Sequence, residues 1–186
     1  MVKVGINGFG RIGRLILRAL LENYKGKIQV VGINDLGSIE ANAHLIKFDS
    51  THGTLNHDVK ISSEGFQIGD QKIKVFAERD PAKLPWGKIG ADIVLECTGL
   101  FLDNASAGKH ILAGAKKVII SAPAKEVDFT IVQGVNSKNL KKEHNVISNG
   151  SCTTNCLAPV AMILEKNFGI NYGYMTTIHS YTGDQK

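Results

Sequence analysis

The chain has 186 residues, of which 43% are hydrophobic and 21% are charged, and its formal net charge at pH 7 is +5. This length can bury a substantial core, and the composition excludes disordered, collagen-like and disulfide-rich classes. No apolar run reaches the roughly 18 residues that span a bilayer. The strand-like start at residues 1–6 leaves no room for a signal peptide, so we expect a cytoplasmic protein with no membrane partner.

The cysteines indicate the redox state of the protein, and the basic residues limit the partners that we expect. Cys97, Cys152 and Cys156 form an odd set without metal-ligand spacing, which predicts reduced thiols rather than a disulfide framework. Lysines and arginines are scattered along the chain. The positive charge could steer anionic ligands or attract nucleic acid weakly, but we expect a solvated surface and no specific nucleic acid partner.

The first predicted elements form a nucleotide-binding unit. A strand at residues 2–6 runs directly into Gly8-Phe9-Gly10-Arg11-Ile12-Gly13, which opens a predicted helix at residues 12–21. Glycines here permit a tight turn and a close approach of the backbone to a pyrophosphate, whose charge lies at the helix N-terminus. We therefore predict that Gly8 and Gly10 contact a dinucleotide cofactor. The alternative is that these glycines serve only helix–strand packing.

The next predicted strand, at residues 28–33, ends at Asn34 and Asp35. Asp35 follows the third glycine by about 20 residues, where a carboxylate accepts hydrogen bonds from the adenosine ribose hydroxyls. It would also repel a 2′-phosphate, and no lysine or arginine follows within residues 35–38. This pattern favours NAD over NADP, unless Asp35 acts only as a cap.

The remaining pattern completes an α/β fold with a Rossmann-type, doubly wound parallel sheet. A helix is predicted around residues 41–48, and short runs with intervening turns predict a small antiparallel insertion. Thr98 and Ser121 follow two later strands, at the edge where an open sheet holds its ligand, although ordinary turns would also explain them. The insertion covers residues 59–61, 66–68 and 73–76; further strands lie at 92–97, 117–121 and 129–132, with a helix at 105–112.

The residue pattern of the sequence changes after residues 146–147. Small polar residues precede a helical apolar face, which predicts a helix starting near Cys152, and a further strand is predicted at residues 174–178. The chain reaches Lys186 within a polar segment. We predict an NAD-binding Rossmann domain over residues 1–150 and the incomplete beginning of an α+β catalytic domain over residues 151–186.

Cys152 is the candidate nucleophile. A thiol reacts as thiolate, and a helix N-terminus or a cationic neighbour lowers its pKa. Cys152 has Ser151 and Thr153 beside it at the predicted first helical turn, and His179 follows the last predicted strand as a candidate base. Spacing alone makes the pairing only plausible, because a lone histidine is more often structural. Cys97 and Cys156 are expected to be inert buried thiols.

Four segments together resemble phosphorylating glyceraldehyde-3-phosphate dehydrogenase of bacterial type. They are INGFGRIGR at residues 6–14, IND at 33–35, SNGSCTTNCLAP at 148–159 and TTIHSYTGDQ at 176–185. In that family a cysteine attacks the substrate aldehyde, a histidine acts as base, hydride passes to NAD, and inorganic phosphate converts the thioester to an acyl phosphate.

The resemblance implies roles for particular residues. Cys152 and His179 take the catalytic roles, Ser151 and Thr153 contact one phosphate group, and Thr182 contacts the other. The implied partners are D-glyceraldehyde 3-phosphate and inorganic phosphate, with a homotetramer as the full-length form and a place in glycolysis. The residues implied to line the cofactor are Asn7, Arg11, Ile12, Asp35, Arg79 and Ser121.

Three alternatives stay open beside this interpretation. The sister family, erythrose-4-phosphate dehydrogenase, shares the cysteine segment, but residues 34–36, 121–123 and 181–183 favour the glyceraldehyde enzyme. Family members continue past Lys186, so the chain could instead be a catalytically inactive NAD-binding fragment. RNA binding is a third reading that rests on the positive charge alone.

Overall fold

A mixed nine-stranded sheet is the framework of residues 1–181, the part of the chain that the computed structural model describes. The elements in chain order are β1 (Val2–Asn7), α1 (Arg11–Asn23), β2 (Ile28–Asn34), α2 (Ile39–Lys47), β3 (Phe48–Asp49), β4 (Gly53–Thr54), β5 (Val59–Ser62), β6 (Gly65–Ile68), β7 (Gln71–Phe76), the 3-10 helix η1 (Pro81–Lys83), α3 (Trp86–Ile89), β8 (Ile93–Glu96), α4 (Asn104–Ala107), α5 (Lys109–Leu112), β9 (Lys117–Ile120), β10 (Phe129–Thr130), η2 (Ser137–Asn139), β11 (Val146–Ser148) and α6 (Cys152–Phe168).

The strand order reverses direction at β1. The order across the sheet is β10-β11-β9-β8-β1-β2-β7-β6-β5, and β1 pairs in parallel with both β2 and β8. The chain thus winds outward from β1 first toward β2 and later toward β8. This is the doubly wound arrangement that the sequence predicted, and the switch point between β1 and β8 is where such sheets hold ligands.

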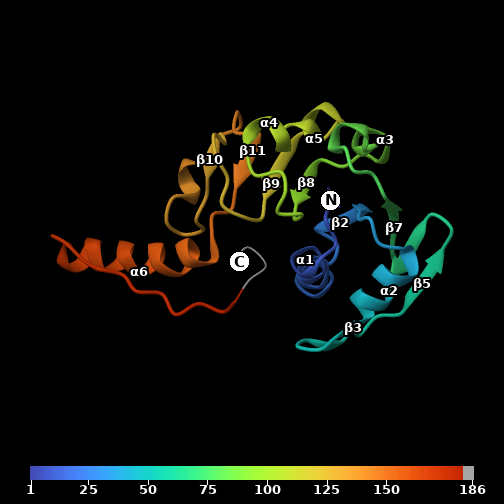
Figure 1. The fold of residues 1–186 in the computed structure, drawn as a ribbon, viewed down its shortest axis with the longest axis horizontal. Helices are drawn as coiled ribbons and strands as arrows, with labels where there is room; N and C mark the ends of the chain where they lie inside the picture. The colour runs from blue at the N-terminus through green and yellow to red at the C-terminus, as the bar shows by residue number, and fades with distance from the viewer. Residues whose placement is uncertain (182–186) are drawn as a thin grey trace.

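Successive residues of β1 face opposite sides of the sheet, and both sides are buried. Val4 and Ile6 belong to a core that includes Leu17 of α1 and Ile46 of α2, whereas Gly5 faces Trp86 on the opposite side. Figure 1 shows α1 and α2 on one side of the strands and α3, α4 and α5 on the other. Both faces are covered because successive strand residues point in opposite directions.

The predicted antiparallel insertion is present as β5, β6 and β7. The central strand β6 pairs antiparallel with both β5 and β7, and β7 also pairs in parallel with β2. The insertion therefore extends the main sheet instead of forming a separate layer. A two-stranded sheet of β3 and β4 was not predicted, because each strand has only two residues and carries no periodic signal.

Two sequence expectations require correction. The helix predicted at 105–112 is two four-residue helices, α4 and α5, that meet at Gly108. The strand predicted at 174–178 is wrong, since these residues have no regular secondary structure. Apolar alternation supplies only one side of a ladder, and no described strand pairs with this segment.

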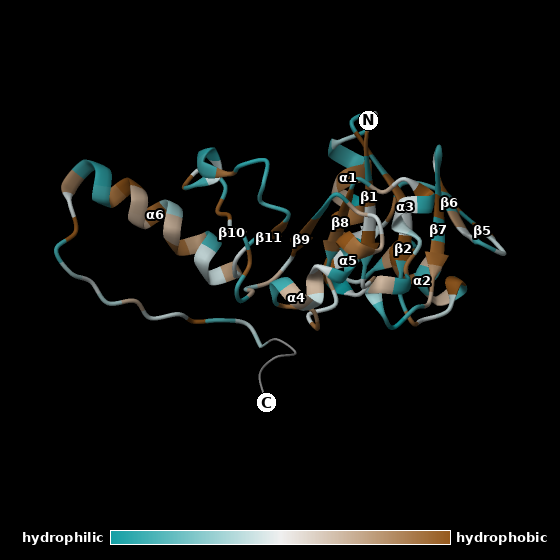
Figure 2. Ribbon diagram, turned by 90° about the horizontal axis from the view of Figure 1, so that it is seen from above, coloured by the Kyte–Doolittle hydropathy of each residue, from teal (hydrophilic) through white to brown (hydrophobic). Residues whose placement is uncertain are grey.

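Helix α6 leaves the sheet after β11 and stands apart from it, and the following residues return in extended form (Figures 1 and 2). None of the residues of α6 is buried. The domain boundary near residue 150 stays a prediction. Within residues 1–181, no helix is long and apolar enough to cross a membrane.

Candidate functional site

A hollow of about 380 Å³ opens at the switch point of the sheet. The loops that follow β1, β2 and β8 form its walls, at the carboxyl ends of these strands. Six residues predicted to bind the cofactor line it: Asn7, Gly8, Gly10, Asp35, Arg79 and Thr98. Leu36, Leu100 and Phe101 also line it and had no signal in the sequence beyond their place after these strands.

The glycine turn is shaped by close backbone packing. Gly8 has φ +88°, and a Cβ there would lie 2.7 Å from the Thr98 amide nitrogen. A Cβ at Gly13 would lie 2.2 Å from the Gly8 carbonyl oxygen. Gly10 differs, because a Cβ there would meet nothing within 4 Å and its φ is −71°. Gly8 and Gly13 are thus required by the fold, while Gly10 leaves open space beside the start of α1.

Gly10→Ala tests whether Gly10 is needed for cofactor binding and not for folding. The added methyl group is expected to leave the melting temperature within about 2 °C of the unaltered chain, because it meets no atom of the protein. It occupies the space through which a pyrophosphate would approach, so we expect NAD to bind about tenfold more weakly. Calorimetric titration measures this. Gly173→Ala, also in open space, is the matched control, and an equal loss in both variants would contradict the role of Gly10.

Asp35 connects two loops around the hollow. Its Oδ2 accepts a hydrogen bond from the Phe9 amide at 2.9 Å, and its Oδ1 accepts one from the Gly37 amide at 2.8 Å. Each carboxylate oxygen accepts two hydrogen bonds, so each keeps capacity for a ribose hydroxyl. The position is therefore suited both to shaping the turn and to holding a ribose.

Asp35→Asn tests the preference for NAD. The amide replaces one acceptor with a donor and removes the charge that repels a 2′-phosphate. We expect NAD affinity to fall about tenfold and the ratio of NAD to NADP affinity to fall with it. Parallel titrations with both nucleotides measure this ratio. An unchanged ratio would show that Asp35 does not select the cofactor.

Three residues implied to line the cofactor lie outside this hollow. Arg11 forms an ion pair with Asp49, and Ile12 is exposed at the first turn of α1. The His52 amide and the Arg11 guanidinium hold the pKa of Asp49 well below its usual range. Ser121 follows β9, where its amide donates to the Glu96 carbonyl at 3.0 Å. Their roles toward a cofactor stay predictions.

Cys152 and His179 are brought together although 27 positions separate them. The Cys152 Sγ lies 3.0 Å from the His179 Nε2, and the His179 Nδ1 lies 2.6 Å from the Ser180 carbonyl oxygen. That carbonyl can only accept, so Nδ1 carries a hydrogen and Nε2 faces the thiol. Ser151 caps α6 through its Oγ, which accepts a hydrogen bond from the Thr154 amide at 2.9 Å. The thiol thus lies in the first helical turn.

The contact shifts both groups toward their charged forms. The hydrogen bond with His179 lowers the pKa of the Cys152 thiol, with a further contribution from Thr153. The same bond raises the pKa of His179, as does its contact with the Ser180 carbonyl. A thiolate beside an imidazolium is the reactive form of such a pair.

The other two thiols differ from Cys152 and from each other. Burial raises the pKa of Cys97 to about 12, which agrees with an inert thiol. Cys156 is exposed, so the expectation that it is buried is wrong for the structure described. It lines a hollow of about 500 Å³ together with Cys152, Thr153 and His179. Thr182, the other predicted phosphate contact, lies outside the described residues.

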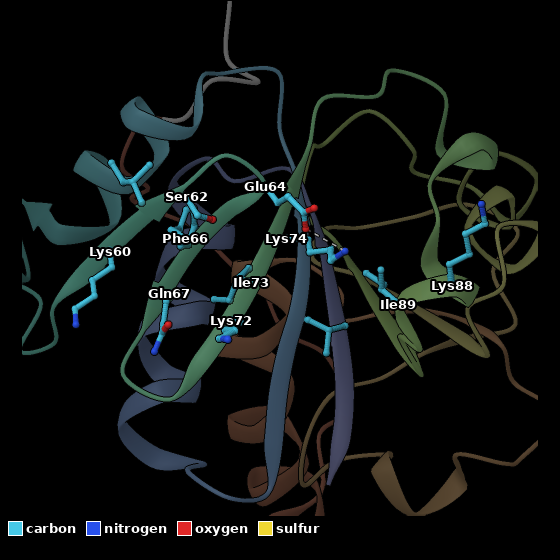
Figure 3. Close-up of a pocket in the computed structure, with 12 residues that line it drawn as sticks. Lys60, Ser62, Glu64, Phe66, Gln67, Lys72, Ile73, Lys74, Lys88 and Ile89 are labelled. Carbon is cyan, nitrogen blue, oxygen red and sulfur yellow. Dashed lines mark ion pairs between the residues drawn. The ribbon is translucent and has the colours of Figure 1, made fainter.

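Another hollow, of about 570 Å³, lies beside β5, β6 and β7 (Figure 3). Four lysines line it, and Lys74 pairs with Glu64 at 3.3 Å. Figure 3 shows the ammonium groups of Lys60 and Lys88 on opposite sides of the view, with Lys72 apart from both. They do not converge on one ligand position, so this hollow is a weaker candidate than the one at the switch point.

A glycine turn at the switch point of a doubly wound sheet, together with an exposed thiol in contact with a histidine, defines a Rossmann-type protein with a candidate cysteine nucleophile. Residues 2–104 match the family model described as "Glyceraldehyde 3-phosphate dehydrogenase, NAD binding domain", and residues 151–186 match the model of the C-terminal domain of the same enzyme. The chain belongs to the glyceraldehyde-3-phosphate dehydrogenase family, and NAD is the cofactor of the domain that it matches.

Curated relatives agree with this family assignment. The chain is 57% identical over 186 residues to glyceraldehyde-3-phosphate dehydrogenase of Geobacillus stearothermophilus, and 56% identical over 186 residues to glyceraldehyde-3-phosphate dehydrogenase 1 of Bacillus subtilis. It is 56% identical over 184 residues to the enzyme of Xanthobacter flavus. These matches cover 99–100% of this chain but 55% of each relative, so the chain spans about half the length of the curated relatives it matches.

Proposed function

We propose that this chain carries the nucleotide site and the thiol chemistry of an NAD-dependent, phosphorylating oxidation of D-glyceraldehyde 3-phosphate to 1,3-bisphosphoglycerate. The observation that carries the proposal is the 3.0 Å contact between Cys152 and His179 in a member of this family. A solvent-accessible thiol with a lowered pKa is suited to attack an aldehyde carbon.

The residues of the switch-point hollow fit a dinucleotide. The open space at Gly10 and the free acceptor capacity of Asp35 are what a pyrophosphate and a ribose require. Asn7, Arg79 and Thr98 would complete the walls. When bound, NAD supplies the hydride acceptor for the oxidation.

Cys152 and His179 would share the proton transfers. The thiolate sulfur bonds to the aldehyde carbon, and the imidazolium gives its proton to the carbonyl oxygen, which yields a thiohemiacetal. His179 then takes this proton back as the carbon is oxidised to a thioester. An oxygen of inorganic phosphate attacks the thioester carbon, the carbon–sulfur bond breaks, and the thiolate is restored beside an acyl phosphate.

The start of α6 is suited to anionic groups. Ser151 is its N-cap residue, with its Oγ accepting from the Thr154 amide, and Thr153 belongs to its first turn. Helix N-termini favour phosphate and developing oxyanions. We propose that Ser151 and Thr153 contact a phosphate group here, with Thr182 contributing to the other phosphate position.

Absorbance of NADH tests the proposal directly. The chain is incubated with NAD and glyceraldehyde 3-phosphate, with and without inorganic phosphate, and with erythrose 4-phosphate as the competing aldehyde. Phosphate-dependent NADH formation that prefers the glyceraldehyde substrate supports the proposal. A preference for erythrose 4-phosphate would assign the chain to the sister activity.

A second candidate is NAD binding without turnover. It is favoured by helix α6, of which no residue is buried, because an unsupported helix holds a catalytic pair less firmly than a packed one. Saturable NAD binding with no detectable NADH formation would support it. The nucleotide hollow, in contrast, is surrounded by buried strands.

The cellular setting belongs to the same proposal. Reduced thiols favour a cytoplasmic location, and membership of the family favours a homotetrameric full-length form. Light scattering of the full-length protein measures its mass. A monomeric full-length protein would contradict the tetramer.

A further inference from the structure

A buried polar cluster lies at the wall of the nucleotide hollow, and only one of its members, Asn7, has a part in the proposed function. The Glu96 cluster consists of Glu96, His110, Trp86 and Asn7, and each side chain belongs to a residue that is at most 1% exposed. Among residues 1–181 no lysine or arginine forms an ion pair with Glu96. A buried carboxylate without a cationic partner is costly unless hydrogen bonds satisfy it.

Four donors surround the Glu96 carboxylate. Its Oε1 accepts from the Thr98 amide at 2.7 Å and from the Thr98 hydroxyl at 2.5 Å. Its Oε2 accepts from the Asn7 Nδ2 at 2.6 Å and lies 2.9 Å from the His110 Nε2. These four contacts use the acceptor sites of both oxygens, so the charged, acceptor-only form is the one that the surroundings satisfy.

Trp86 determines the orientation of the histidine proton. The Trp86 Nε1–H donates to the His110 Nδ1 at 2.9 Å, and an indole nitrogen can only donate. The hydrogen of the ring must therefore be on Nε2, where it points to Glu96. The 3.4 Å approach of the Asn7 Nδ2 to the His110 Nε2 is then a contact between two donors that share one acceptor.

The Glu96 contacts join two walls of the hollow. Asn7 precedes the glycine turn, and Thr98 begins the loop that continues to Leu100 and Phe101. The two loops also touch directly, since a Cβ at Gly8 would lie 2.7 Å from the Thr98 amide nitrogen. Asn34 extends the connection, because its Nδ2 donates to the Asn7 Oδ1 at 2.7 Å.

We propose that Glu96, oriented by His110 and Trp86, is a positioning residue for the dinucleotide, which fixes the Asn7 and Thr98 walls of the hollow in their binding arrangement. This inference rests on the assignment of NAD to the hollow. Glu96 touches no proposed substrate atom, so its effect is on cofactor affinity. Preorganised walls bind more tightly because less ordering is required on binding.

Glu96→Gln is the direct test. The amide keeps the shape but turns one acceptor into a donor, which must face either Thr98 or the Asn7–His110 pair. We expect NAD to bind about tenfold more weakly at a temperature where circular dichroism shows the variant fully folded. A folded variant with an affinity within about twofold of the unaltered chain would overturn the proposal.

A matched pair at His110 separates positioning from packing. His110→Gln can still donate to Glu96 from a nitrogen near the Nε2 position but no longer accepts from Trp86. His110→Asn can still accept from Trp86 but no longer donates to Glu96. Both break one buried hydrogen bond and lower the melting temperature. We expect NAD affinity within about threefold of the unaltered chain for the Gln variant and about tenfold weaker for the Asn variant.

The outcomes distinguish this proposal from the assignment on which it rests. Equal NAD affinities in the two His110 variants would overturn the positioning role, and the pair decides the question if Glu96→Gln does not fold. Absence of saturable NAD binding by the unaltered chain would instead overturn the cofactor assignment and the proposal with it. Binding by the unaltered chain with unaffected variants overturns only the role of Glu96.

Discussion

Replacing Cys152 with serine is expected to reduce NADH formation by about 10³-fold or more. A serine hydroxyl does not ionise near neutral pH, so the variant cannot form the thiolate–imidazolium pair that the 3.0 Å contact between Sγ and the His179 Nε2 allows. The side chain is exposed, so the variant should fold as the unaltered chain does. NAD affinity should stay unchanged, because the hollow at the switch point contains no residue of α6.

Cys156→Ser is the control for this experiment. Cys156 is also exposed on α6, but the shift of pKa toward thiolate is assigned to Cys152 and its bond with His179. The control should keep its activity, and iodoacetamide should label Cys152 before Cys156 when the products are mapped by mass spectrometry. Preferred labelling of Cys156, or activity in Cys152→Ser, would contradict the assignment of the nucleophile.

Replacing His179 with glutamine is expected to reduce turnover by about 10²- to 10⁴-fold, the usual contribution of a general acid–base group. The amide nitrogen can lie near the position of Nε2 but cannot act as a base. The contact lowers the pKa of Cys152 and raises that of His179. The Cys152 thiol should therefore begin to ionise below the ordinary thiol pKa of about 8.5, and His179 should keep its proton above the ordinary histidine pKa of about 6.5.

The pH dependence of alkylation checks the sign of this argument. In the unaltered chain, the rate of Cys152 labelling should begin to rise at a lower pH than for an ordinary thiol. In His179→Gln the lowering contact is lost, so the profile should move to higher pH. The Cys156→Ser background keeps the measurement specific to Cys152. A profile that is the same with and without His179 would show that the histidine does not activate the thiol.

Local sequence signals correctly predicted many strands of the sheet. They also predicted the helix that begins at the candidate nucleophile. The strand at 2–6, the glycine turn and the following helix were correctly predicted, because turn, cap and apolar period act over a few residues. The helix starting at Cys152 follows from the same kind of signal. The strand at 174–178 failed, since a strand is stable only when a neighbour supplies the other half of its hydrogen bonds.

Only the tertiary structure shows which residues distant in the sequence lie close together and which side chains are exposed. Nothing local states that Arg11 pairs with Asp49, or that Cys156 is exposed. The one signal for the Glu96 cluster was a charged residue at the end of an apolar strand, and the sequence could not indicate that His110 and Trp86 surround it.

The sequence by itself determined which residues are candidates for the chemistry: a glycine turn suited to a dinucleotide and a cysteine at the start of a helix. The tertiary structure decided which of them meet. Cys152 and His179 come within 3.0 Å, and Asn7, Glu96 and Thr98 join at the switch point, because crossover connections bring distant strand ends to one edge of the sheet. Residue type is encoded locally, whereas proximity is a property of the whole fold.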